Sequence, residues 1–173
     1  MSDKKPFSSN LDRLKNQGIQ KFTNDKESLK KTKNLLIKAD EEAINEFKII
    51  AFDYYKFSKQ LSLFSFRHYL ALVLYNLEND FQEKYGKIEE PDKDYLSFYQ
   101  KRGNKALLTR EVKVKGHFTF ILPLRYVELY YRLMHTYYIN EVPHLASYSI
   151  SLFFYYIVDY IKEKKLKFYD INI

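Results

Sequence analysis

The sequence predicts a mostly α-helical protein that also contains two short strands. Only 4 glycines and 4 prolines occur among 173 residues, which leaves few turn points and favours long helices. Hydrophobic residues make up 46% of the chain, enough for a substantial core. A short alternating segment followed by two amphipathic helical patterns also occurs twice, about 83 residues apart.

The first copy begins with alternating residues at 33–39, and Asp40-Glu41-Glu42 marks the expected start of a helix. Apolar residues then follow at helical spacing in two runs, which predicts two helices, each with one buried face. The positions are Ala43, Ile44, Phe47, Ile50, Ala51 and Tyr54, and then Phe66, Leu70, Val73, Leu74 and Leu77.

The second copy follows the same plan, with its alternating segment at 115–122 and a helix expected from Pro123. Its apolar positions are Tyr126, Val127, Tyr130, Leu133, Met134 and Tyr137, and then Ile150, Phe154, Ile157, Val158 and Ile161. Few letters match between the copies, Tyr54 with Tyr137 being one, so the pattern is repeated more than the sequence.

These segments divide the chain into four predicted parts. Residues 1–30 lack a sustained apolar period and are expected to form a flexible basic arm. Units at 31–85 and 113–173 flank a linker at 86–112, which contains Gly103 among dense charge. The net charge of the whole chain is +7, and the stretch through Lys33 carries nine lysines or arginines against four acids. A basic arm suits an acidic polymer or anionic surface as partner.

Composition excludes several functional classes. The absence of cysteine rules out disulfides, thiolate metal sites and a cysteine nucleophile. The most membrane-like window, 145–161, contains Asp159 and three serines, and is interpreted as a buried helix and not a membrane span. The four histidines lack metal-binding spacing, and no Gly-rich phosphate loop or catalytic triad motif is present. We therefore expect a cytoplasmic protein that is not an enzyme, with no cofactor, no metal and no membrane partner.

A strand followed by two helices within about 50 residues resembles the ribbon-helix-helix family of DNA-binding proteins, across roughly 32–83 and 114–165. The resemblance implies that two copies pair their strands into an antiparallel ribbon that enters the major groove of DNA. Two copies in one chain imply a pseudo-dimer of two tandem β-α-α units. Tandem forms resemble proteins of plasmid partition and of conjugative DNA-processing complexes.

Alternation along each strand predicts which side chains face DNA. If Leu35, Ile37 and Ala39 are buried on one strand, and Phe118, Phe120 and Leu122 on the other, the remaining residues point outward. Lysine and asparagine can hydrogen-bond to purine edges, whereas leucine and isoleucine can touch a thymine methyl group. The candidate base-reading residues are Asn34, Leu36, Lys38, Lys115, His117, Thr119 and Ile121.

The resemblance also implies that the second helix of each unit offers its N-terminal amides to a DNA phosphate. Serines lie where those helices should begin, and their simplest role is to cap the helices. The candidate phosphate-binding residues are Lys33, Lys59, Ser62, Ser65, Arg67, Ser147 and Ser149.

The first functional hypothesis is a plasmid-partition adaptor that binds double-stranded DNA, assembles as a homo-oligomer on it, and contacts a partner ATPase. The ATPase contact is assigned to Leu11, Arg13 and Leu14, because related partition proteins use an arginine in a flexible tail. A transcriptional repressor or a conjugative relaxosome accessory factor would use the same fold. A different class is an all-helical protein-interaction module whose basic arm binds an acidic partner.

Overall fold

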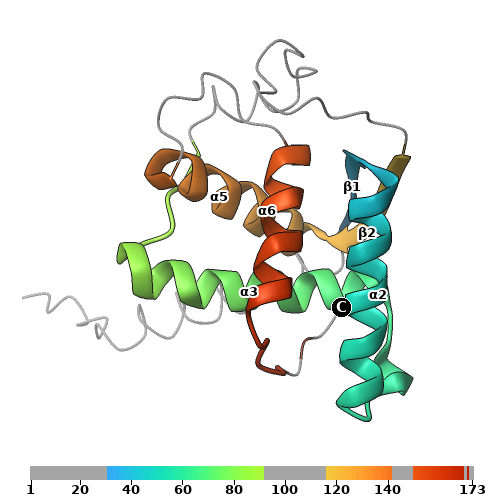
Figure 1. Cartoon of the computed structure of the whole chain (residues 1–173). Helices are drawn as coiled ribbons and strands as arrows, with labels where there is room; N and C mark the ends of the chain where they lie inside the picture. Colours follow the sequence, from blue (N-terminus) through green and yellow to red (C-terminus); the bar gives the residue numbers. More distant parts are fainter. Residues whose placement is uncertain (1–30, 92–115, 142–149, 170, 172–173) are drawn as a thin grey trace, which may run out of the picture.

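The computed structural model describes residues 31–91, 116–141, 150–169 and 171. The elements, in chain order, are β1 (Thr32–Ala39), α2 (Glu41–Phe57), the 3-10 turn η1 (Leu61–Leu63), α3 (Phe66–Tyr85), β2 (Gly116–Pro123), α5 (Leu124–Glu141) and α6 (Ile150–Glu163). Figure 1 shows the four α-helices gathered around the strand pair, with α6 crossing in front of α3.

The two strands pair antiparallel, as the alternating segments predicted. Thr32 lies opposite Pro123 at one end of the ladder, and Ala39 lies opposite Gly116 at the other. Gly116 suits this place because a Cβ there would lie 3.0 Å from Cδ1 of Ile44, which packs beneath the strand end. The described residues contain this one sheet, and α2, η1 and α3 lie between its two strands in the sequence.

Local sequence explains where the helices begin and end. Glu41 and Glu42 place negative charge in the first turn of α2, where it complements the positive end of the helix dipole. Ser65 caps α3, because its hydroxyl accepts a hydrogen bond from the His68 amide at 3.1 Å. Gly86 ends α3 in the left-handed region, with φ of 80°, a conformation that glycine adopts without strain.

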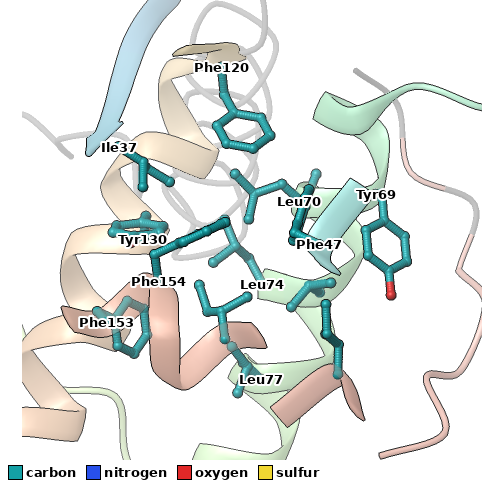
Figure 2. Close-up of a cluster of buried hydrophobic side chains, with 14 of the residues drawn as sticks. Ile37, Phe47, Tyr69, Leu70, Leu74, Leu77, Phe120, Tyr130, Phe153 and Phe154 are labelled. Atoms are coloured by element: carbon teal, nitrogen blue, oxygen red, sulfur yellow. The ribbon is translucent and has the colours of Figure 1, made fainter. Parts of the chain in front are cut away.

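One aromatic side chain joins the sheet to the helices. Phe47 of α2 lies 5.7 Å from Phe120 of β2 and 5.4 Å from Phe154 of α6, measured between ring centroids. Its edge also meets Tyr69 of α3 at 5.4 Å. Figure 2 shows Phe47 among apolar side chains that come from both halves of the chain. The interior is therefore one continuous core.

The prediction of two tandem ribbon-helix-helix units forming a pseudo-dimer is wrong. The described residues form one helix-rich domain with a single strand pair, and neither half closes a core of its own. Helix α3 packs most extensively on α5, and α2 packs on α6, so each helix relies on the other half of the chain. Apolar residues have the same spacing in any two amphipathic helices, so the sequence pattern indicated a repeated unit that the structure does not contain.

The C-terminal segment after α6 is held against α3 by one buried amide. Asn76 donates from Nδ2 to the Lys167 carbonyl and accepts from the Lys167 amide through Oδ1, both at 3.0 Å. The same Nδ2 also donates to the Leu72 carbonyl at 2.9 Å. Leu166 is buried beside this contact, and the ring of Tyr169 meets Tyr75 with centroids 4.6 Å apart. The segment thus covers a side of α3 that would otherwise face water.

We predict that Asn76→Ala lowers the free energy of unfolding by about 1–3 kcal/mol, because it removes the buried amide that hydrogen-bonds to both backbone groups of Lys167. Asn79→Ala is the matched control, since Asn79 is an exposed residue of the same helix whose side chain donates to the Tyr75 carbonyl one turn earlier. Urea unfolding followed by circular dichroism measures both. Equal losses in the two variants would contradict the role assigned to Asn76.

Candidate nucleic-acid interface

The period-2 alternation gives the sheet one buried face and one face open to solvent. Leu35, Ile37 and Leu122 are completely or almost completely buried against the helices, and so is Phe120. The intervening side chains point away from the core. The predicted inward and outward assignments of the described strand residues are confirmed except at Phe118, which was expected to be buried and is half-buried.

We define the outer sheet face as the six exposed side chains of Asn34, Leu36, Lys38, His117, Thr119 and Ile121. The register places them in three opposed pairs: Asn34 with Ile121, Leu36 with Thr119, and Lys38 with His117. The structure therefore brings together six of the seven candidate base-reading residues. Lys115 lies outside the described residues.

The chemistry of this face is mixed and contains no carboxylate. Lys38 and His117 supply hydrogen-bond donors at the end of the sheet nearest α2, and Asn34 supplies an amide at the other end. Leu36, in the middle pair, is 45% exposed, and Ile121, opposite Asn34, is 55% exposed. Large apolar side chains kept in solvent on a sheet face are characteristic of a contact surface.

The start of α3 lies beside the sheet. The ring of Phe66, the first residue of α3, meets the half-buried ring of Phe118 in β2 at 5.6 Å. His68 fixes this start by two bonds, because its amide donates to Ser65 and its Nδ1 hydrogen-bonds with the Tyr55 hydroxyl. Arg67 is exposed in the same turn. The positive end of the α3 dipole is thus held next to β2 with a cation beside it.

The other candidate phosphate-binding residues occupy different places. Lys59 is exposed and adopts a left-handed backbone with φ of 58°, and Ser62 is exposed within η1. Lys33 has the parity of the buried face and lines a cleft of about 440 Å³ beside α5, together with Arg125 and Glu128. Ser147 and Ser149, like the arm residues Leu11, Arg13 and Leu14, lie outside the described residues.

Two features near the sheet were not found from the sequence. Lys48 of α2 places its Nζ 5.1 Å from the centroid of the Phe118 ring, which adds a cation beside β2. Burial raises the pKa of Tyr54, and burial together with the neighbouring Tyr54 raises the pKa of Tyr55. Both phenols therefore stay neutral at physiological pH. Helical spacing marks Lys48 as a surface residue, but it does not reveal which strand lies next to it.

No protein-family model, curated protein or solved structure matches this chain. Among the helices within the described ranges, none combines the length and the hydropathy needed to cross a bilayer. In the same ranges, histidine, aspartate and glutamate side chains do not gather into a group of three or more that would suit a metal ion. The outer sheet face is therefore the candidate interface of this protein, on its geometry and chemistry alone.

We predict that Ser65→Ala lowers the free energy of unfolding by about 1 kcal/mol, because the His68 amide loses its capping acceptor. Ser62→Ala is the matched control, since Ser62 is exposed in η1 and that element has no side-chain cap. Thermal and urea unfolding measure both variants. A Ser65→Ala protein as stable as the wild type would show that this hydroxyl does not stabilise α3.

Proposed function

We propose that this protein binds double-stranded DNA by placing the outer sheet face in the major groove. The observation that carries the proposal is a two-stranded antiparallel sheet with one face buried and an exposed outer sheet face that carries no carboxylate. The major groove is wide enough to admit a two-stranded ribbon of this kind. The net charge of +7 adds attraction to the phosphate backbone.

Four side chains of the outer sheet face match groups displayed in the groove. The amide of Asn34 can bond to the N6 and N7 atoms of adenine, and Lys38 can bond to O6 and N7 of guanine. Leu36 and Ile121, which are costly to expose to water, can contact thymine methyl groups. Arg67, Lys48 and the start of α3 lie beside the sheet, where phosphates would pass.

Within this class we propose a partition adaptor first, with Leu11, Arg13 and Leu14 contacting an ATPase. A repressor or a conjugation accessory factor would bind through the same face. Mapping the bound DNA distinguishes them, because repeat arrays beside partition genes, promoters and nick sites are different targets.

A second candidate is a protein-interaction role for the same face, favoured by the exposure of Leu36 and Ile121. The two strands rule out the all-helical form of this alternative that the sequence left open. The two candidates differ in how DNA binding depends on the DNA sequence. A protein-binding face would attract any duplex by charge and prefer none of them.

We predict that selection from a random duplex library enriches a defined sequence, and that Asn34→Ala and Lys38→Ala each reduce discrimination against a scrambled duplex. The expected loss is about 1–3 kcal/mol per variant, the value of one specific base contact. Fluorescence anisotropy with both duplexes, at several salt concentrations, measures it. Asn79→Ala, on the exposed side of α3, should behave as wild type.

Arg67→Ala should instead weaken binding to both duplexes alike. It should also reduce the slope of log affinity against log salt concentration by about one, as expected of a phosphate contact. If the wild type binds selected and scrambled duplexes equally, base reading by the outer sheet face is ruled out. If Asn34→Ala and Lys38→Ala leave DNA binding unchanged, the DNA binds at another surface of the protein.

A further inference from the structure

A second surface of the molecule exposes large apolar side chains. We define the apolar patch as Ile49 and Phe52 of α2, Phe57 at its end, and Leu61 and Leu63 of η1, all of which are about half exposed or more. Phe57 is the most exposed, at 77%. The turn is tied to α2 by the bond from the Gln60 amide to the Tyr55 carbonyl, and the ring of Phe52 meets Phe64 at 5.7 Å. Contiguous apolar exposure on this scale marks an interaction site.

The surroundings of the apolar patch are positively charged. Lys56 and Lys59 are exposed between its members and have no ion-pair partner among the residues described. Asp53 is the only acid between residues 48 and 65. An occupant therefore needs apolar or aromatic surface together with carboxylates. Two apolar patches facing each other across a two-fold axis would bring like charges together, which disfavours a symmetric dimer through this surface.

The same molecule carries a complementary surface. We define the acidic cleft as the hollow of about 640 Å³ between the C-terminal halves of α3 and α6. Its walls carry four carboxylates, Asp80, Glu83, Asp159 and Glu163, around aromatic side chains that include Tyr156 and Tyr160.

The two lysines of the acidic cleft already have partners. Lys84 pairs with Glu141 at 2.5 Å, and Lys164 pairs with Asp80 at 3.6 Å. Glu83, Asp159 and Glu163 are exposed and have no cation within ion-pair distance among the described residues. The acidic cleft thus offers both the aromatic surface and the negative charge that the apolar patch requires.

The two surfaces lie too far apart to meet within one molecule. Phe64 and Phe66, whose rings are 5.2 Å apart, place η1 at the start of α3. The acidic cleft begins at Asp80 and lies near the other end of that helix, roughly 20 Å away at 1.5 Å per residue. In Figure 1 the end of α2 projects below α3 at the right, whereas the C-terminal end of α3 lies at the left.

We propose that copies of this chain associate head to tail, with the apolar patch of one copy seated in the acidic cleft of the next. Such a contact buries Phe57 against aromatic side chains and sets Lys56 and Lys59 against Glu83, Asp159 and Glu163. Because the two surfaces differ, each added copy leaves one of each kind free, and the assembly grows past the dimer until the rotation between copies closes it into a ring or leaves it an open chain. This association requires no DNA and goes beyond the proposed function.

The test is sedimentation velocity over a range of protein concentrations, without DNA. The wild type should grow past the dimer as concentration rises. Phe57→Glu in the apolar patch and Asp159→Lys in the acidic cleft should each weaken association by about tenfold or more, through lost apolar burial and reversed charge. Ile139→Glu and Glu128→Lys are matched controls at exposed positions outside both surfaces and should associate as the wild type does.

Mixing the two impaired variants separates head-to-tail association from contacts in which identical surfaces of two copies pair with each other. Asp159→Lys retains an intact apolar patch and Phe57→Glu an intact acidic cleft, so an equimolar mixture should form dimers and stop there. Failure of the mixture to form dimers would overturn the proposal, as would a wild type that stays monomeric. Phe57-dependent binding of a monomeric wild type to phosphatidylserine-containing vesicles would assign the apolar patch to a membrane surface instead.

Discussion

The antiparallel pairing of β1 with β2 is the constraint on which the rest of the structure depends. The two strands are distant in sequence, and a two-stranded sheet is only marginally stable by itself. The helices supply the missing stability from one side. Phe47 links α2 to β2, α3 and α6 in one aromatic cluster, and this cluster lies beneath the buried residues of both strands. The strands and the core therefore stabilise each other.

Burial of one sheet face determines what the other face can do. A shift of one residue in the register would bring Asn34 and Lys38 into the core and expose Leu35 and Ile37, which the desolvation of polar groups forbids. The register in turn fixes the three opposed pairs of the outer sheet face. Folding energy and the proposed recognition of DNA thus depend on the same alternation of side chains.

The sequence predicted the features that depend on local periodicity. Period 2 identified both strands and the outward direction of Asn34 and Thr119, and period 3.6 identified core positions such as Phe47 and Phe154. Periodicity shows which side of a helix is buried but not which element covers it, so the pairing of α3 with α5 was missed and tandem units were predicted. For the same reason, the sequence did not show that Lys33 lies in a cleft beside α5. It also did not show that Asn76 hydrogen-bonds to the backbone of Lys167.

NMR of the protein with a duplex selected from a random library tests the central claim most directly. We expect nuclear Overhauser effects between the paired residues of β1 and β2, and chemical-shift changes on adding the duplex that concentrate at Asn34, Leu36, Lys38, His117, Thr119 and Ile121. A scrambled duplex should produce much smaller changes at these positions. If the cross-strand effects are absent, or if the duplex leaves the shifts of the outer sheet face unchanged, DNA binding by a β1–β2 ribbon is wrong.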